Sequence, residues 1–402
     1  MKKLFELLKG DRALWIVVIL LSFIGVVEVF SSTATLGYKY KDGNTFFHLI
    51  KHLSFVVIGF IIMFVTSRIS YKRTFKIAGP FLWFSAALLL ITLFSGNDTN
   101  NARRWIEIPL VGLSFQTSDL AKLALMLYLA KTISQAKDDA NETEKKNVFK
   151  QCIIAVGAIC LLILPANFST AFLVGVTSLV VLYIGRVKIK WLLMTVGAAV
   201  VLFGFFVAVT QLSGSQSRVG TWSKRIETFF SSDSDGSGAN FQTEQAKIAI
   251  ASGGITGKGI GKSQQRTVLP HPYSDFIYAE IVEECGLVGA IGIVILYLVF
   301  FYRCIAIIRD SDRTYPAFVV LGFSLNIIFQ AVANMLVAVH ITPVTGQPLP
   351  FVSMGGTSLI FTSISTGIIL NISRYAGKKE TVEEIEDEME EEELTDYPFI
   401  TG

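Results

Sequence analysis

The sequence is poor in charge. Asp, Glu, Lys and Arg make up only 17% of its 402 residues, whereas a soluble domain carries roughly 25%. Hydrophobic residues account for 52% and aromatic residues for 12%. This balance predicts an integral membrane protein and excludes a chain of ordinary soluble domains. A strongly basic nucleic-acid-binding protein is also excluded, because the formal net charge at pH 7 is only +3.

Cysteine and histidine are scarce as well, with four residues of each. His48 and His52 have the spacing of a metal-binding pair on a helix, but no third ligand is nearby. We therefore interpret them as packing residues and assign no metal site. The cysteines lie in or beside apolar runs and never in a CxxC pattern, which excludes a disulfide framework and a zinc site. They are Cys152, Cys160, Cys285 and Cys304.

Charges of opposite sign are separated along the chain. Eleven Asp and Glu residues lie between Glu380 and Asp396. The sequence before Lys378 carries 33 Lys and Arg against 21 Asp and Glu, a net charge of +12. We predict a polytopic membrane domain over residues 1–377 and an acidic, disordered cytoplasmic tail over residues 378–402.

Ten apolar runs are candidates for membrane helices, which need about 20 residues to span a bilayer. The first follows a basic start and is too long for a cleavable signal peptide, so we expect it to be retained. The expected fold is an all-α integral membrane protein with about ten transmembrane helices. The runs lie at roughly 14–32, 52–66, 78–95, 118–135, 150–165, 168–185, 191–211, 276–301, 315–340 and 354–373.

The distribution of Lys and Arg predicts the orientation. With the N-terminus inside, the short cytoplasmic segments collect 22 of them and the short outer loops only five, so both termini are predicted to be cytoplasmic. One long connection, residues 213–275, is then extracytoplasmic and precedes the eighth helix. We interpret residues 231–238 as a flexible link, and the spacing in residues 241–252 predicts a helix on the outer membrane surface.

A charged cluster is expected at the outer end of the fourth helix. Lys122 follows Asp119 by three residues, so the two share a helix face and can pair. Arg103 and Arg104 precede Trp105, an aromatic residue suited to the membrane interface. Two interpretations stay open: a structural ion pair with snorkelling arginines, or three cations that bind an anionic head group such as a lipid pyrophosphate.

A glycine-rich run closes the long loop, from Gly253 to Ser263. It does not fit a nucleotide-binding phosphate loop, because that motif requires glycine five residues before Gly261 and Thr256 stands there. The run also lies outside the cell in the predicted topology. We therefore expect no nucleotide cofactor.

Asp275 stands alone where the long loop meets the eighth apolar run. Partial burial there would make it a better proton acceptor, but Ser274 and Asp275 also suit a helix N-cap; both interpretations remain open. Glu283 and Glu284 are expected to stabilise the first turns of this helix. Glu28, in the first apolar run, needs a partner inside the bundle that the sequence does not identify.

Three prolines and three glycines interrupt the apolar sequence between residues 343 and 356. Irregular backbone at membrane depth is tolerated only where it lines a cavity or is packed in protein. We predict a loop that faces the substrate.

Together these segments resemble the SEDS family of peptidoglycan polymerases. The similarity extends over nearly the whole chain, and its motifs occur in the family order. The family fold, ten transmembrane helices with a long extracytoplasmic loop before the eighth, agrees with the topology derived above. The motifs are Asn101 to Trp105, Ser118 to Lys122, the glycine-rich run through Gly261, Ser274 to Ala279 with Glu283 to Gly286, and Pro343 to Ser358.

The resemblance implies that Asp275 is the catalytic aspartate of a glycosyltransferase that elongates glycan strands with lipid II at the outer face of the cytoplasmic membrane. The nucleophile needs a base and the pyrophosphate leaving group needs positive charge, for which Arg103, Arg104 and Lys122 are the candidates. A divalent cation, Mg²⁺ or Mn²⁺, is a candidate cofactor. The other candidates for substrate binding are Ser274, Pro343, Thr345, Gly346, Ser353, Gly355 and Gly356.

The chain departs from the family pattern at three points. His271 stands where the family often has Glu, and residues 165–167 (Pro-Ala-Asn) stand where many members have Gln-Pro-Asp. Asp119 replaces a common Glu. The first two changes each remove a carboxylate, so we do not expect an acid at either position to be essential.

The resemblance also implies partners: a class B penicillin-binding protein, which is a transpeptidase that crosslinks the new strands, and other division proteins. Overall similarity and the extended tail favour a role in division, at the septum, over one in elongation. Two further classes of function remain open. A lipid II flippase would not need a base at Asp275, and a membrane scaffold would use the tail to recruit division proteins.

Overall fold

The protein is described by a computed structural model that covers residues 9–40, 45–95, 97–99, 102–108, 113–136, 142–212, 238–265 and 273–377. Each predicted apolar run coincides with a helix, which confirms the all-α fold class. These helices are α2 (Arg12–Tyr40), α3 (Thr45–Thr66), α4 (Tyr71–Ser95), α5 (Thr117–Ser134), α6 (Glu142–Ile163), α7 (Phe168–Ile184), α8 (Ile189–Leu212), α11 (Ile277–Arg309), α12 (Thr314–Ala338) and α13 (Thr357–Ser373).

Not every helix has the length and hydropathy of a membrane span. Within the described part of the chain, α2, α3, α4, α6, α11 and α12 do; α7 and α13 are apolar but shorter, and α8 contributes the apolar stretch Ile189–Gly204. Helix α5 is the exception, because it carries Asp119, Lys122 and Lys131 and buries most of its residues between its neighbours. Charged side chains are tolerated in α5 because protein, rather than lipid, surrounds this helix. The count of ten spans stays a prediction.

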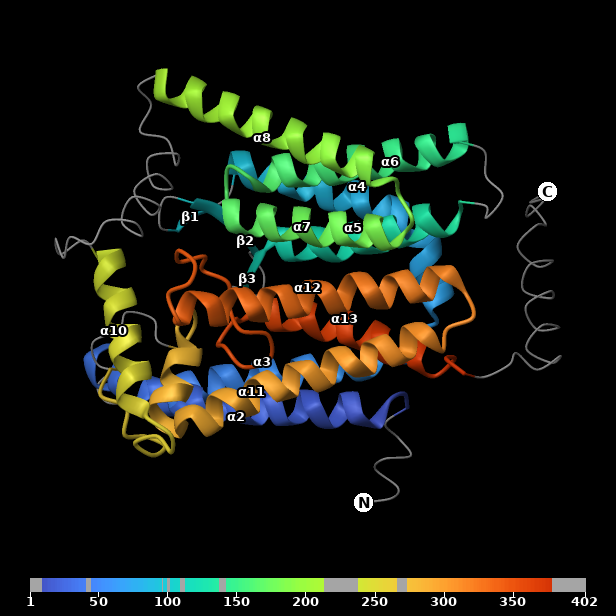
Figure 1. Ribbon diagram of the computed structural model, residues 1–402. Helices are drawn as coiled ribbons and strands as arrows, with labels where there is room; N and C mark the ends of the chain where they lie inside the picture. The colour runs from blue at the N-terminus through green and yellow to red at the C-terminus, as the bar shows by residue number, and fades with distance from the viewer. Residues whose placement is uncertain are drawn as a thin grey trace, which may run out of the picture.

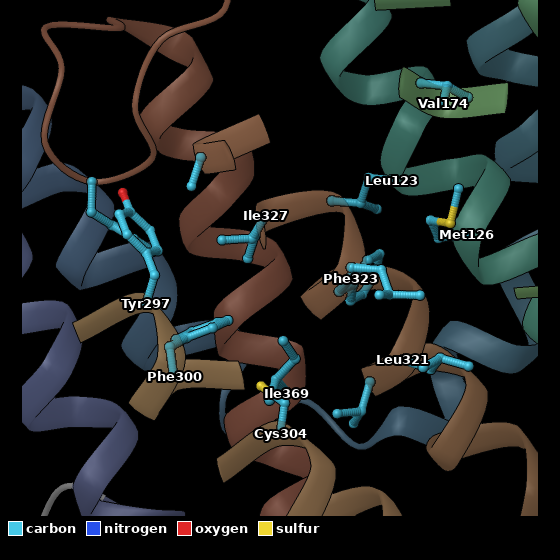
Figure 2. Close-up of a cluster of buried hydrophobic side chains, with 14 of the residues drawn as sticks. Leu123, Met126, Val174, Tyr297, Phe300, Cys304, Leu321, Phe323, Ile327 and Ile369 are labelled. Atoms are coloured by element: carbon cyan, nitrogen blue, oxygen red, sulfur yellow. The ribbon is translucent and has the colours of Figure 1, made fainter. Parts of the chain in front are cut away.

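Helix α12 packs against α5, α7, α11 and α13. Apolar side chains alone gain little by associating within lipid, so close fit between helices supplies much of the stability. Gly322 of α12 provides such a fit, since a Cβ there would lie 3.1 Å from the Met126 sulfur of α5. Figure 2 shows α12 side chains lying between those of α5 and α7 on one side and those of α11 and α13 on the other: Leu321, Phe323 and Ile327 between Leu123, Met126, Val174 and Tyr297, Phe300, Cys304, Ile369.

Non-spanning elements gather at one end of the bundle, on the left of Figure 1. The first is a small antiparallel sheet in the order β1-β2-β3, in which Trp105 lies opposite Gln116. The second is α10, and the third is the α12–α13 connector, residues 339–356, which has no regular secondary structure. The bounds are β1 (Asn97–Thr99), β2 (Ala102–Ile108), β3 (Leu113–Gln116) and α10 (Gly238–Gly253).

The sheet was not predicted, whereas α10 was. The strands have only three, seven and four residues, so the alternation in β3 (LSFQ) and at the end of β2 (IEI) is too short to identify a strand. Helix α10 packs against α11 through Ala246 and Ala249, which are fully buried, and exposes Phe241 and Ile248. That the exposed face lies on the membrane stays a prediction.

Helix α11 is interrupted at Gly286, whose backbone (φ 65°, ψ −161°) is not helical. The break exposes peptide groups that residues of the preceding loop then bind. Lys258 N donates to Glu283 O (3.0 Å) and Gly259 N to Glu284 O (2.9 Å), while Leu287 N and Val288 N donate to Gly254 O (3.0 Å) and Ile255 O (3.3 Å). The Gly-rich segment, residues 253–263, thus pairs with α11 much as a strand pairs with its neighbour.

Only glycine fits at the points where the Gly-rich segment and α11 approach each other most closely. A Cβ on Gly257 (φ +78°) would lie 2.1 Å from Glu284 O, and a Cβ on Gly286 would lie 2.4 Å from Gly257 N. Both positions also have the positive φ that other residues adopt at a cost. Close approach to α11 explains Gly253 and Gly257, whereas Gly254, Gly259 and Gly261 have room for a Cβ and are explained by their positive φ.

Candidate functional site

Residues 273–275, which lead into α11, are held by their main-chain carbonyls. Each carbonyl accepts a hydrogen bond from α12 or from the connector, so this short segment has a defined backbone although it is not helical. The donors lie far away in the sequence, which ties three parts of the chain together at one point. The bonds are Met354 N to Tyr273 O (3.0 Å), Ser353 Oγ to Ser274 O (2.7 Å) and Asn334 Nδ2 to Asp275 O (3.0 Å).

The Asp275 side chain is partly exposed. Its Oδ1 accepts a hydrogen bond from Ser274 Oγ (3.0 Å). A Cβ on Gly346 would lie 3.7 Å from its Oδ2, so the connector passes beside the carboxylate. The N-cap of α11 is Phe276 and not Ser274 or Asp275. The capping interpretation of these two residues is therefore wrong, and the role of Asp275 as a proton acceptor stays a prediction.

Buried amides of α12 hold the connector. Gln330 and Asn334, one turn apart, donate to Pro348 O (2.9 Å) and Gln347 O (2.8 Å). Gln347 in turn donates to Thr170 Oγ1 of α7 (2.7 Å). These bonds satisfy peptide groups that the irregular backbone leaves without helical partners, as a membrane interior requires.

The connector residues predicted to bind substrate differ in how their polar groups are used. Ser353 is buried and uses its hydroxyl structurally, since it also accepts from Leu349 N (2.8 Å). Thr345 differs, because its buried Oγ1 has no hydrogen-bond partner among the described residues. The others line the same stretch: Pro343 is partly exposed, Gly346 lies beside Asp275, and Gly355 and Gly356 precede α13.

Asp119 and Lys122 form a buried ion pair with an N–O distance of 2.7 Å, each side chain less than a tenth exposed. Lys122 Nζ also donates to Gln330 Oε1 (3.4 Å). Because Gln330 holds Pro348 O, the pair is linked to the connector. Lys122 is thus committed to protein partners, as the structural interpretation requires, and its contact with a pyrophosphate stays a prediction.

Arg103 and Arg104 lie on β2, the central strand of the sheet. Their side chains are outside the described part of the structure. The sheet itself is tied to the bundle, because Thr357 Oγ1 at the start of α13 donates to Ser114 O of β3 (3.4 Å). The two arginines are therefore carried at the same end of the bundle as the connector (Figure 1).

Glu283 and Glu284 anchor the Gly-rich segment. Glu283 is fully buried and accepts from Lys258 Nζ (2.7 Å) and Ser263 Oγ (2.5 Å), as well as from the main-chain N–H groups of Gln264 (3.1 Å) and Gln265 (3.3 Å). Glu284 accepts from Gly261 N (3.0 Å) and from Ser31 Oγ of α2 (2.5 Å). Both therefore join the loop to the helix.

Glu28 lies beside the same region of α11. Its Oε1 is 4.0 Å from the sulfur of Cys285, and its buried Oε2 has no hydrogen-bond partner among the described residues. Glu280, which the sequence analysis did not single out, is also buried and accepts from Ser32 Oγ of α2. The partner expected for Glu28 is thus not a basic residue of the described chain, but a set of acidic and polar groups.

The hairpin between α6 and α7 is closed by Asn167, whose Oδ1 accepts from Thr170 N (3.3 Å) as an N-cap. An asparagine performs this role as well as an aspartate. A small pocket beside the hairpin is lined by residues of three helices, including Thr117, Ser118 and Asn167. The position at which the family often has a carboxylate is therefore filled here by a neutral capping residue.

The histidines add little to the site. His52 is buried, as a packing residue would be; the side chain of His48 lies outside the described residues, as do all of His271 and the acidic tail. Burial and, secondarily, Lys247 of α10 lower the pKa of His340. Among the described residues no group of three His, Cys, Asp or Glu side chains could hold a metal ion.

Asn334, Gln330 and Gln347 are the functional neighbours that sequence reasoning missed. A usable signal existed: two amides four residues apart within an apolar run share a helix face, and buried amides need partners. The signal did not show that the partners would be carbonyls of the connector and of Asp275.

Residues 11–378 match the FtsW/RodA/SpoVE family, whose description is cell cycle protein. The chain is 30% identical over 377 residues to the "Probable peptidoglycan glycosyltransferase FtsW" of Trichlorobacter lovleyi, covering 93% of this chain and 95% of the relative. It is 31% identical over 370 residues to the "Stage V sporulation protein E" of Bacillus subtilis, covering 91% and 97% of the two chains.

Solved structures share the fold. A chain of the structure described as "Structural coordination of polymerization and crosslinking by a peptidoglycan synthase complex" has a TM-score of 0.70 at 25% identity, covering 92% of this chain and 99% of that one. The Thermus thermophilus rod shape determining protein RodA has a TM-score of 0.64 at 24% identity, with coverage of 92% and 98%.

Proposed function

The chain belongs to the FtsW/RodA/SpoVE family of cell cycle proteins, and from this premise we propose that it polymerises lipid II into glycan strands for the septal cell wall. It is a multi-pass membrane protein and a peptidoglycan glycosyltransferase. The naming of several relatives as FtsW supports a role in division. An elongation polymerase would use the same chemistry and is the alternative.

The observation that carries the mechanism is the setting of Asp275. A partly exposed carboxylate on a fixed backbone suits a general base, and it lies beside an irregular connector in which the buried Thr345 Oγ1 has no partner among the described residues. In the proposed reaction a sugar hydroxyl of lipid II attacks the anomeric carbon at the lipid-linked end of the strand. Asp275 takes the hydroxyl proton, the new glycosidic bond forms, and the bond to the pyrophosphate oxygen breaks. Undecaprenyl pyrophosphate leaves with the electron pair.

The leaving group needs positive charge as that bond breaks. Arg103 and Arg104 are our first candidates, because the sheet carries them at the connector end of the bundle. Lys122 would contribute through Gln330 and the connector, and would touch the pyrophosphate only if its bond to Asp119 were rearranged.

A divalent cation would neutralise charge on the pyrophosphate. The described residues offer Asp275 as a single carboxylate, with the Ser274 hydroxyl beside it. This donor set fits Mg²⁺ or Mn²⁺ only if phosphate oxygens of the substrate complete the coordination, as is usual for Mg²⁺. We therefore place any cation with the substrate.

The partner is proposed to be a class B penicillin-binding protein that crosslinks the strands. The similarity to a chain from a peptidoglycan synthase complex supports this assignment. Both termini are proposed to be cytoplasmic, with the sheet, α10 and the connector at the outer face, where lipid II and the growing strand meet. Other division proteins are proposed to join the complex at the septum.

The test is polymerisation of lipid II by the purified protein with its transpeptidase, comparing wild type with Asp275→Ala. We expect the variant to lose activity by at least about 100-fold, the lower range for a general base. Polymerisation at the wild-type rate would show that Asp275 is not the base.

A second arm separates polymerase from flippase. Transport of a fluorescent lipid II analogue across vesicles would be measured for the same two proteins. Transport by both, without polymer from either, would favour the flippase and overturn the proposed function. The matched control is Asn167→Asp, which restores a carboxylate that the family often has and is expected to leave both readouts within about twofold.

A further inference from the structure

Asn334 of α12 binds the main chain of Asp275 and that of the connector at once. Its Nδ2 donates to Asp275 O (3.0 Å) and to Gln347 O (2.8 Å). Both amide hydrogens are therefore used, and reversing the amide would place two carbonyl oxygens against Oδ1. The side chain is 1% exposed, so water does not compete for these bonds.

One of the two carbonyls that Asn334 binds belongs to Asp275 itself. The other belongs to the connector, next to the point where the connector passes the carboxylate. Gln347 directly follows Gly346, the residue beside Asp275 Oδ2. Holding Gln347 O and Asp275 O on one nitrogen fixes the distance between the connector and the backbone of Asp275. The direction of the carboxylate depends on that backbone.

Asn334 satisfies two main-chain carbonyls but leaves one polar atom of its own without a partner among the described residues. Its Oδ1 is buried and has no partner among the described residues. A buried acceptor without a partner costs on the order of 1 to 3 kcal/mol, and an apolar residue in place of Asn334 would instead leave Asp275 O and Gln347 O without this donor. Buried groups of this kind are kept where the arrangement serves function.

The geometry points to Asn334 as a positioning residue for the transferase: it sets the place of the Asp275 carboxylate relative to the substrate-facing connector. The inference rests on the proposed function, in which Asp275 is the base. Asn334 does not touch the reacting atoms. It acts through Asp275, and displacing a catalytic group by about 1 Å can reduce the rate by about 100-fold.

The principal test is Asn334→Leu in the purified complex with its transpeptidase. We expect kcat for lipid II polymerisation to fall about 30-fold while KM stays within about threefold, because the loss is in placement of the base and not in substrate binding. The acid limb of the pH profile of kcat should also move, since it reports the base in the bound complex.

The matched control is Asn371→Leu on α13. Asn371 is equally buried, and it accepts from Tyr71 N (3.1 Å) and donates to Ser67 O (2.9 Å). Its loss should lower the thermal unfolding temperature at least as much as Asn334→Leu does. The kcat of the folded fraction and its pH profile should stay at the wild-type values.

Two results would overturn the inference. One is a kcat per folded Asn334→Leu molecule that equals the Asn371→Leu value. The other is a lower kcat whose pH profile is unchanged and whose size matches a smaller active fraction. If Asn334→Leu does not fold, Asn334→Gln is used, which keeps the donor on an arm one methylene longer. It should fold and lose about 3-fold to 10-fold in kcat; full activity would again overturn the inference.

Asp275→Ala measured in parallel separates the role of the base from the role of Asn334. If it retains polymerisation, the assignment of the base is wrong. If it loses polymerisation while both Asn334 variants keep theirs, only the positioning role is wrong.

Discussion

Asp275 and Glu283 are two carboxylates eight residues apart at the start of α11, and the structure fixes them in opposite ways. Glu283 is immobilised through its side chain, which is fully buried and receives hydrogen bonds from the Gly-rich segment and the residues after it. Asp275 is immobilised through its main chain, by Asn334. Its carboxylate is partly exposed and accepts from the neighbouring Ser274.

The difference distinguishes a carboxylate with a structural role from one that can take part in proton transfer. A carboxylate whose lone pairs are occupied by lysine, serine and main-chain donors is a poor proton acceptor, because protonation would break those bonds. A carboxylate placed by its backbone can change its protonation state without changing the fold. Burial alone would have favoured Glu283 as the functional group, and the pattern of hydrogen bonds reverses that choice.

The largest contrast should come from matched amide substitutions. Asp275→Asn keeps the shape and removes the base, so kcat for polymerisation should fall about 1,000-fold, about 4 kcal/mol in the barrier, with the unfolding temperature nearly unchanged. Glu283→Gln should destabilise the fold by about 3 kcal/mol, because it leaves Lys258 unpaired and turns an amide donor toward other donors. Activity and thermal unfolding of both variants would be measured together.

The comparison fails if the two effects are exchanged. A stable Glu283→Gln protein with 1,000-fold lower kcat would indicate that Glu283, and not Asp275, acts in the reaction. An unfolded Asp275→Asn protein would mean that the Asp275 carboxylate has a structural role.

A smaller loss of stability is expected for alanine substitutions in the Gly-rich segment. Gly257→Ala combines a positive φ with a Cβ 2.1 Å from Glu284 O, so it should destabilise the fold by about 2 kcal/mol or more. Gly254→Ala is the control: its φ is also positive (+57°), but no atom lies within 4 Å of the added Cβ. Only the conformational cost of about 1 kcal/mol should remain. Equal shifts in unfolding temperature would show that the segment does not pair with α11 in solution.

The smallest effect is expected for Glu28→Gln. Glu28 Oε2 has no hydrogen-bond partner among the described residues, and a buried charge without a cation is unfavourable. An amide should therefore be tolerated within about 1 kcal/mol. Glu284→Gln replaces one of the two oxygens that accept from Ser31 Oγ and Gly261 N with an amide donor, so it should cost about 2 kcal/mol. A larger loss at Glu28 than at Glu284, measured by thermal unfolding, would indicate an unrecognised partner.

Most helices were predictable because their apolar runs are long and continuous, and length and hydropathy identify such segments, although α5 with its three charges fits this criterion less well. The antiparallel sheet was not, since the alternation in strands of three to seven residues is too short to be distinguished from an ordinary loop. The break in α11 at Gly286 was also not predictable. It depends on a partner segment about thirty residues earlier in the chain, and glycine is common in membrane helices where it only allows two helices to approach closely.

The candidate site was predictable in part. The sequence identified Asp275 by its isolation at a helix start, and the connector by its prolines and glycines. It did not identify Asn334 or Gln330, because their function lies in contacts between α12 and two distant segments. It also assigned Lys122 to the substrate as readily as to Asp119, since spacing along a helix does not reveal burial.

The backbone pairing between the Gly-rich segment and α11 has a consequence for length variation. Surface loops ordinarily accept inserted or deleted residues with little penalty. Here one added residue between Gly254 and Gly259 would shift the register of the pairing, turn Lys258 away from Glu283 and bring a side chain against Glu284 O. Insertions should therefore be tolerated in the long loop only outside residues 253–263. In a scan of single-residue insertions, this segment should be as intolerant as a transmembrane helix.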